Sequence, residues 1–366
     1  MTADFKKRLQ GLKSRRLGLD MEPALAKSAL RFAEAATQTE AYEERATSDA
    51  LKYGLGAMQE VGAQYTAICY EEGDRVRAQL ESGLLGRGIR ATFEYQGSVP
   101  LNLHIRGASD VDLLVLHDGF VTVDWSGPRS QTYVTLGSSV IADMLQLRSV
   151  SETTLAARFP AATVDRSGCK SIRMEGGSLR RKIDVVPAHW HDTAAYQASS
   201  QKHDREVRIL DKSVPTTIAN RPFMHMRRIN DKDTLTNGGA KKVIRLLKNL
   251  SKDSDRNIAL TSYDIAALVW HFDDESLKRP RYLEVALIAE TQAHLHCLVQ
   301  NRQACEALMA PDRSRKIIDS ADKFYSLISL RAEVDELAAQ IAQELNPLGL
   351  QTPQHIQKRL IEAYIA

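Results

Sequence analysis

The chain has 366 residues, 43% of them hydrophobic and 26% charged, and its formal net charge is +3. This length favours two lobes, the composition is ordinary for a soluble globular protein, and the mild charge argues against a polynucleotide-binding protein. The four cysteines form no disulfide-like pattern, the basic N-terminus has no apolar signal core, and no apolar run reaches the roughly 20 residues of a membrane span, so we expect a cytoplasmic protein.

The N-terminal part has a helical pattern and is followed by a region rich in strands. Apolar residues recur at roughly helical spacing between Ala24 and Ile68, which predicts two or more long helices. Alternating and apolar runs then predict the next elements up to about residue 215. They are strands at 89–95, 111–116, 170–175, 179–186 and 205–210, a helix near 138–146 and a loop at 125–133.

From about residue 216 the pattern becomes helical. An amphipathic helix is predicted at 240–250, another begins at Ser262, and more follow at 281–300, 314–329 and 331–345. We therefore expect an α+β protein with two lobes. Residues 1–215 would form a core with a mixed twisted sheet flanked by long helices, and residues 216–366 a helical substrate-binding lobe, with a ligand cleft between them.

Two short motifs indicate the chemistry. Gly97-Ser98 follows the first predicted strand, and Asp110-Val111-Asp112 opens an apolar run. Alternate residues of a strand point to the same face, so the two carboxylates project together and repel each other unless a cation lies between them. Mg²⁺ takes carboxylate oxygens and substrate phosphates as ligands, and glycine lets the backbone approach a phosphate closely. The pair of motifs therefore predicts a magnesium-dependent nucleotidyltransferase.

A third acid is expected, because two-metal phosphoryl transfer places ions on both the attacking and the leaving oxygens. The best candidate is Asp184, between two apolar residues on the second strand of a predicted hairpin that turns at Gly176-Gly177. The alternative is that Asp184 forms an ion pair with Arg180 or Lys182. The predicted catalytic and metal-binding acids are thus Asp110, Asp112 and Asp184, holding two Mg²⁺ ions for which Mn²⁺ can substitute.

These motifs in combination resemble one branch of the polymerase-β-like nucleotidyltransferases. Gly97-Ser98, the run Arg106-Gly107-Ala108-Ser109-Asp110-Val111-Asp112 and Asp184 are similar to the 2′-5′-oligoadenylate synthetase and cyclic GMP-AMP synthase branch. The run 241–248 and the helix start at Ser262-Tyr263 look like that branch's triphosphate-binding lysine helix and Ser-Tyr pair. The length, and the absence of a zinc-binding insertion, are most similar to the bacterial cGAS/DncV-like nucleotidyltransferases of anti-phage signalling.

The resemblance implies roles for the residues that contact the donor nucleotide. Gly97 and Ser98 would cradle its triphosphate, Lys248 and Ser262 would reach it from the helical lobe, and Tyr263 would stack on a nucleobase. Lys241, one heptad before Lys248, is the competing choice for the lysine. A solvated lysine and a core aromatic residue are the alternative interpretations of Lys248 and Tyr263.

The resemblance also implies the reaction. A ribose hydroxyl attacks the α-phosphate of a nucleoside triphosphate, ATP among the substrates, pyrophosphate leaves, and a second turnover closes a cyclic di- or trinucleotide. It implies a downstream effector that responds to the product and a conjugating or regulatory partner at the C-terminal tail 362–366, without direct activation by nucleic acid. The alternatives are a linear oligonucleotide synthetase, an RNA- or protein-modifying nucleotidyltransferase, and a catalytically silent nucleotide sensor.

Overall fold

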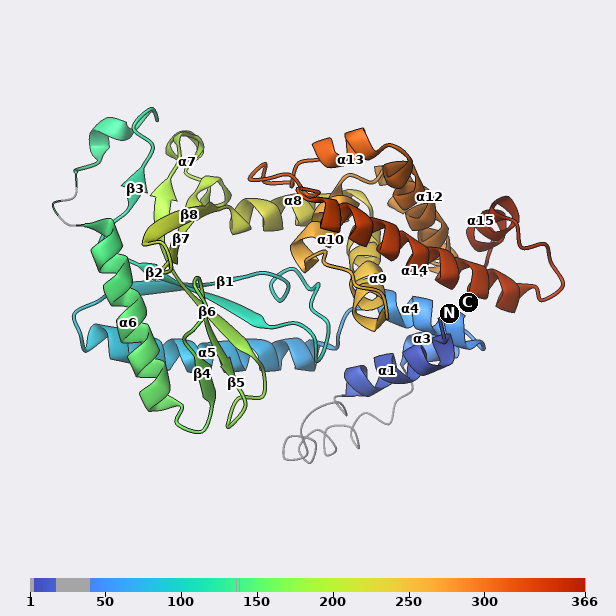
Figure 1. Ribbon diagram of the computed structural model, residues 1–366, viewed down its shortest axis with the longest axis horizontal. Coiled ribbons are helices and arrows are strands. Elements are labelled where there is room, and N and C mark those ends of the chain that lie inside the picture. Colours follow the sequence, from blue (N-terminus) through green and yellow to red (C-terminus); the bar gives the residue numbers. More distant parts are fainter. Residues whose placement is uncertain (1–2, 18–39, 136, 138, 366) are drawn as a thin grey trace. The chain divides into compact units, whose positions relative to one another are not determined.

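A computed structural model describes residues 3–17, 40–135, 137 and 139–365 (Figure 1). The helical pattern that begins at Ala24 falls on 18–39 and so lies outside the described residues. The chain forms two compact units. The sheet unit comprises Gly62–Asn102 and Ser109–Arg227, and the helical unit comprises Met1–Val61, Leu103–Ala108 and Arg228–Ala366.

The sheet unit is built on one twisted mixed sheet with the strand order β1-β2-β6-β5-β4. Strands β2 and β6 pair in parallel, whereas β1 with β2, β5 with β6 and β4 with β5 pair antiparallel. Short β3 and the ribbon of β7 and β8 continue the sheet from the far end of β6. The strands are β1 (Ala91–Gln96), β2 (Val111–His117), β3 (Thr122–Val123), β4 (Thr163–Asp165), β5 (Ile172–Glu175), β6 (Ile183–Asp192), β7 (Glu206–Asp211) and β8 (Thr216–Asn220).

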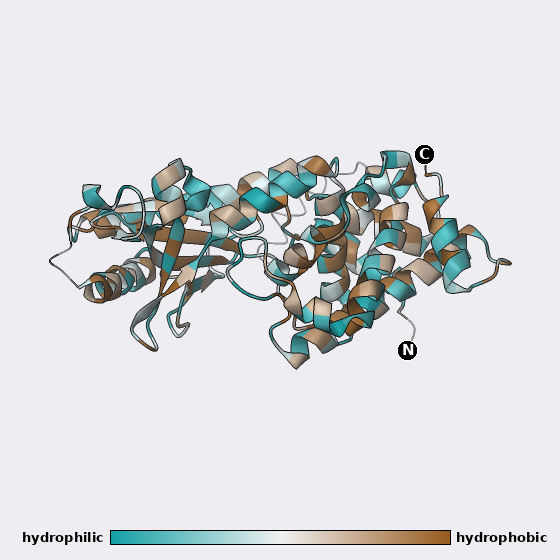
Figure 2. Ribbon diagram, turned by 90° about the horizontal axis from the view of Figure 1, so that it is seen from above, coloured by the Kyte–Doolittle hydropathy of each residue, from teal (hydrophilic) through white to brown (hydrophobic). Residues whose placement is uncertain are grey.

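The central strands β2 and β6 are apolar on both faces, because both faces of the sheet are covered there. Helices α5 (Ala63–Leu85) and α6 (Val140–Arg158) pack on one face. On the other face Leu114, Leu116 and Trp190 form a buried cluster with Phe223 from α8 (Pro222–Leu235). Figure 2 shows these strands in brown. Only the ends of β2 and β6 carry acidic residues.

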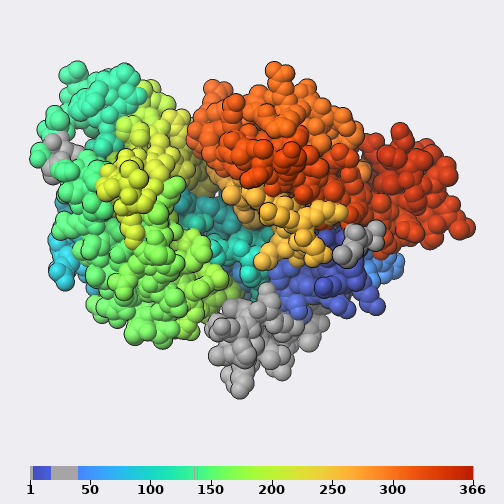
Figure 3. All heavy atoms as spheres, viewed as in Figure 1, coloured from blue at the N-terminus to red at the C-terminus, as the bar shows by residue number. Residues whose placement is uncertain are grey.

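Ten helices that belong wholly to the helical unit are described, together with the 3-10 turn η3 (Arg281–Leu283). The residues after about 300, orange to red in the space-filling view, make up much of its visible surface (Figure 3). The helices are α1 (Phe5–Leu17), α3 (Ala41–Glu44), α4 (Asp49–Met58), α9 (Gly239–Asp253), α10 (Ser262–Trp270), α11 (Asp274–Leu277), α12 (Ala286–Gln300), α13 (Arg302–Ala307), α14 (Ala321–Leu345) and α15 (Pro353–Ile361). The sheet unit carries α7 (Ala194–Ser199), η1 (Ser130–Thr132) and η2 (Lys202–Asp204).

The two units differ from the expected ranges 1–215 and 216–366 because the N-terminal helices pack with the C-terminal ones. Helix α4 contacts α1, α9 and α14, and Arg8 of α1 forms a buried ion pair of 2.6 Å with Glu333 of α14. Burial of the apolar faces of α1 and α4 therefore takes place among the helices that follow residue 228.

Other expected elements differ in their bounds. The segment 179–182 precedes strand β6 rather than belonging to it, and β8 occupies 216–220, where a helical pattern was expected to begin. The two helices expected at 314–329 and 331–345 are one helix, α14, because no proline or glycine interrupts it and Leu330 at the expected break is buried. Among the described residues no helix has the length and apolar character that crossing a membrane requires.

Candidate active site

A row of side chains in register crosses the sheet at the start of β2, and four of them concern the predicted acids. Strand register pairs Gln96 with Asp112, Asp112 with Asp184, and Asp184 with Arg173. Residues that are directly opposite each other on neighbouring strands carry their side chains on the same face. The two predicted acids Asp112 and Asp184 are therefore neighbours on one face of the sheet, with the amide of Gln96 on one side of the pair and the guanidinium of Arg173 on the other. Register continues the row beyond Arg173 to Asp165 of β4.

Asp110 precedes β2 and adds a third carboxylate beside this row. Burial raises the pKa of Asp110, and the negative charge of Asp184 raises it further, whereas Arg173 and Lys182 lower it. A charge on Asp184 can act in this way only where the two carboxylates are near each other. The structure thus brings Asp110, Asp112 and Asp184 together, as the sequence predicted.

The ion-pair partner of Asp184 is Arg173, whose Nε lies 3.3 Å from Asp184 Oδ1. The alternative partners considered from sequence, Arg180 and Lys182, are wrong. Arg180 Nε donates to Glu72 at 2.7 Å, and Lys182 pairs with an acid of its own hairpin. The hydrogen bond to Asp184 and its charge raise the pKa of Arg173, with a further contribution from Asp110.

Gly97 begins the turn that follows β1 and lies against Asp112. Its φ of +77° is in the left-handed region, and a Cβ atom placed on it would be 2.2 Å from Asp112 Oδ2. Ser98 follows in the same turn and is partly exposed. The backbone of the Gly-Ser turn therefore lies so close to Asp112 that only a glycine fits at position 97.

The donor set of this row fits a hard divalent cation. Carboxylate oxygens are the ligands that Mg²⁺ prefers, and it takes others from substrate phosphates. The buried Oε1 of Gln96 has no hydrogen-bond partner among the described residues, although buried polar atoms normally have one. Within the described parts of the chain no group of three or more acidic, histidine or cysteine side chains is placed so that it could hold a metal ion. The register offers the carboxylates of Asp112 and Asp184 on one face of the sheet, and further ligands for such an ion would have to come from substrate phosphates.

The other predicted nucleotide contacts belong to the helical unit. Lys248 of α9 is only 5% exposed, and its Nζ donates to the carbonyl oxygen of Leu103. Lys241, in the first turns of α9, is half-buried and lies 3.8 Å from Asp233 Oδ2. The structure therefore gives Lys248 an internal role in the helical unit and leaves Lys241 nearer the surface.

Ser262 and Tyr263 open helix α10, as the sequence predicted. A capping box between Thr261 and Asp264 fixes this helix start. Ser262 is exposed, and the ring of Tyr263 lies under the guanidinium of Arg315, 4.9 Å from ring centroid to Cζ. Burial raises the pKa of the Tyr263 hydroxyl. An aromatic face that already contacts a cation is presented at a helix N-terminus, where backbone N–H groups favour anions.

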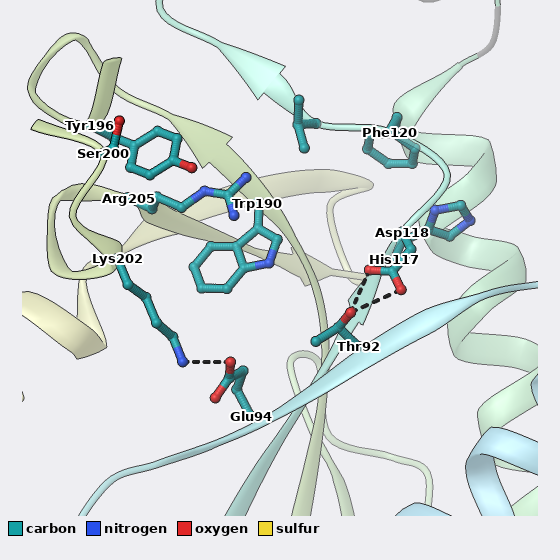
Figure 4. Close-up of a pocket in the computed structure, with 11 residues that line it drawn as sticks. Thr92, Glu94, His117, Asp118, Phe120, Trp190, Tyr196, Ser200, Lys202 and Arg205 are labelled. Carbon is teal, nitrogen blue, oxygen red and sulfur yellow. Dashed lines mark hydrogen bonds and ion pairs between the residues drawn. The ribbon is translucent and has the colours of Figure 1, made fainter. Parts of the chain in front are cut away.

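A cavity of about 490 Å³ lies farther along the same face of the sheet (Figure 4). Its cations are already paired. Lys202 contacts Glu94, and Arg205 bonds Asp192 at 2.6 Å while its guanidinium lies 4.4 Å from the ring centroid of Trp190. Each of these two cations therefore already has an acid beside it.

Comparison with known proteins identifies the family. The sequence model of the cGAS/DncV-like nucleotidyltransferase C-terminal helical domain matches residues 227–340. The cyclic dinucleotide synthase CdnE of Yersinia aleksiciae is 40% identical over 312 residues, which is 84% of this chain and 81% of that protein. This chain is a cGAS/DncV-like nucleotidyltransferase. A c-di-GMP synthase of Capnocytophaga granulosa is 33% identical over 78% of this chain and 86% of its own length.

Solved structures agree with the fold. The STING-associated CdnE c-di-GMP synthase from Capnocytophaga granulosa matches with a TM-score of 0.71 and 27% identity, covering 94% of this chain and all of that chain (100%). A STING-associated CdnE c-di-GMP synthase from a Flavobacteriaceae species matches with a TM-score of 0.75 at 22% identity, over 93% and 99% of the two chains, and supports the fold alone.

The predicted family, the α+β fold and the enzyme class are confirmed by these relatives, and so is synthesis of a cyclic oligonucleotide. Membership of the family also implies metal-dependent catalysis. The roles of individual residues stay predictions. Two members of the row were missed from the sequence, Gln96 and Arg173, because strand register alone brings them beside the acids.

Proposed function

We propose that this nucleotidyltransferase joins two nucleoside triphosphates into a cyclic dinucleotide and that GTP is among its substrates. The observation that carries the proposal is the register of Asp112 opposite Asp184, with Asp110 close by. The relatives from Capnocytophaga granulosa and from a Lachnospiraceae bacterium, 33% and 30% identical to this chain, are both named c-di-GMP synthases. Their names support guanine and a ring of two nucleotides.

The three acids would hold two Mg²⁺ ions, or Mn²⁺ in their place, which would neutralise the negative charge of the reacting phosphate. Asp184 would accept the proton of the attacking ribose hydroxyl. The Gly97-Ser98 turn would bind the triphosphate through its backbone N–H groups, because a glycine there lets phosphate oxygens come close. Catalysis by these residues is then positioning and charge stabilisation.

We assign the triphosphate-binding lysine to Lys241 rather than to Lys248. Lys248 is buried and donates to a backbone carbonyl, whereas Lys241 is partly exposed and within 3.8 Å of a single carboxylate oxygen that it can leave. Ser262 would donate its hydroxyl to the triphosphate, and Tyr263 would stack on a base, with Arg315 on its ring.

The biological context is part of the same proposal. The matching structure from Capnocytophaga granulosa, 27% identical to this chain, is described as STING-associated, and we propose that the product is a second messenger read by an effector in anti-phage signalling. A conjugating partner at the C-terminal tail has less support. Ile365 is buried, its N–H bonds the carbonyl oxygen of Tyr282, and Tyr364 stacks on Tyr282 with ring centroids 5.3 Å apart. Ala366 lies outside the described residues.

The test is product identification. Purified protein is incubated with each nucleoside triphosphate alone and with every pair, with Mg²⁺ or Mn²⁺, and the products are analysed by mass spectrometry with nuclease mapping of the linkages. We expect pyrophosphate release and a cyclic dinucleotide that contains guanine. The control is the double variant Asp110→Asn with Asp112→Asn, which should release none. A linear product, a three-membered ring or a product without guanine would contradict the proposal.

A further inference from the structure

Arg173 is the cation nearest to the carboxylate that we assign to the metal. Its Cα is paired with that of Asp184 across β5 and β6, so both side chains lie on the same face. The side chain of Arg173 is 53% exposed and that of Asp184 is 17% exposed. Among the described residues, Arg173 forms an ion pair with Asp184 and with no other acid. The guanidinium can therefore leave Asp184 without breaking another ion pair.

The guanidinium of Arg173 and a divalent metal ion would repel each other if both were bound to the carboxylate of Asp184. A guanidinium already 3.3 Å from Oδ1 would repel a divalent ion bound to the same carboxylate. The repulsion is largest before substrate binds, because the phosphates that would screen it are then absent. The charge of Arg173 also acts on Asp110, the other end of the proposed metal site.

We propose that Arg173 is the resident counter-ion of Asp184, that a metal ion displaces it, and that Arg173 thereby makes metal binding weak until a triphosphate adds its own negative charge. This rests on the proposed function, since it takes Asp184 as a metal ligand. In physical terms, Arg173 offsets one of the three negative charges of the site in the free enzyme and couples metal binding to substrate binding.

The experiment measures Mn²⁺ binding to the nucleotide-free full chain by calorimetry and by the loss of the free-ion electron paramagnetic resonance signal. The variant is Arg173→Gln. The matched control is Lys182→Gln, because Lys182 lies in the same hairpin, is 58% exposed, also acts on Asp110, and pairs with Glu175 instead of with Asp184. Melting curves establish that each variant is folded.

We expect Arg173→Gln to bind Mn²⁺ about fivefold more tightly than the parent, the factor that corresponds to about 1 kcal/mol for an exposed ion pair. Lys182→Gln should change the affinity by less than about twofold. The gain in Mn²⁺ affinity on adding a non-hydrolysable GTP analogue should be smaller in Arg173→Gln. Arg173→Lys, which keeps the charge, should stay close to the parent.

Unchanged or weaker Mn²⁺ binding by Arg173→Gln would overturn the inference, because Arg173 would then orient Asp184 rather than compete for it. Equal tightening in Lys182→Gln would also overturn it, since the effect would be a general field. If the parent protein makes the cyclic dinucleotide while either result is found, only this inference fails. If it makes no such product, the proposed function fails.

Discussion

The Oδ2 atom of Asp112 lies 2.2 Å from the position that a Cβ atom on Gly97 would occupy. No real side chain fits at that distance. The turn expected to bind phosphate and the acid expected to bind metal are therefore packed against each other, and this is possible because Gly97 has no side chain. Gly97 is required there both for space and for its φ of +77°.

Gly97→Ala should therefore reduce synthesis by more than the strain in its backbone alone would cause. The control is Gly176→Ala, whose φ of +72° is nearly the same but whose Cβ would meet no atom within 4 Å. We expect both variants to lose about 1 kcal/mol of unfolding free energy from the left-handed backbone. Only Gly97→Ala should lose activity, by about 100-fold or more, because Asp112 must move. Comparable pyrophosphate release by the two variants would show that this contact does not matter.

Asp184→Asn should leave the fold intact and reduce pyrophosphate release by about 1,000-fold or more, because it removes a metal-binding oxygen and the proton acceptor together. The structure offers Asp165→Asn as a control. Asp165 is opposite Arg173 in the register of β4 and β5, but it is exposed and accepts a hydrogen bond from the hydroxyl of Ser167 in its own turn. Turnover within tenfold of the parent for Asp184→Asn would remove Asp184 from the active site.

Asp110→Asn should abolish synthesis and raise the melting temperature of the metal-free protein near pH 7.5. Burial and Asp184 raise the pKa of Asp110 above its unfolded value, so the folded protein favours the protonated form, and stability is lost as pH rises from about 3.8 through the raised folded value. A neutral Asn avoids that loss. The gain in melting temperature of Asp110→Asn over the parent should be complete at pH 7.5 and should fade below pH 4. Scanning fluorimetry in the presence of a chelator measures it. A lower melting temperature at pH 7.5 would contradict this assignment.

The two lysines of α9 should respond to substitution in opposite ways. Lys248→Met removes the donor to the buried carbonyl of Leu103 and should cost about 1–3 kcal/mol of unfolding free energy in urea titrations. Lys241→Met should leave stability within about 0.5 kcal/mol of the parent but raise the KM for GTP several-fold. Were Lys248→Met stable and Lys241→Met fully active, the choice between them would have to be reversed.

The sequence was informative where chemistry is local and silent where strand pairing decides. Asp110 and Asp112 are found from a two-residue spacing after a Gly-Ser turn. Arg173 was not recognised as a neighbour of Asp184 from the sequence, because a tight hairpin at Gly176-Gly177 predicts a register in which Arg173 is opposite Arg180. The observed loop runs from 176 to 182, which moves Asp184 into that place. Loop length within a hairpin sets register, and polar loop residues do not reveal it.

The packing of the N-terminal helices was hidden for a similar reason. An apolar stripe shows that a helix is buried on one side but not which segment covers it. The ion pair of Arg8 with Glu333 joins residues 325 positions apart, and no local pattern links them. The amphipathic helix α9 was predicted closely, since its lysines and leucines alternate at helical spacing over the whole length.

The chain crosses from one compact unit to the other four times, and the short return at Leu103–Ala108 ends just before Asp110. Within that return, Leu103, His104 and Ile105 are almost fully buried in the helical unit. A recombinant fragment cut at residues 62 and 227 would carry these three side chains away from their surroundings and present them to water. Crystallographers and enzymologists who want the sheet unit by itself should therefore expect it to aggregate, and should replace 103–108 with a polar linker.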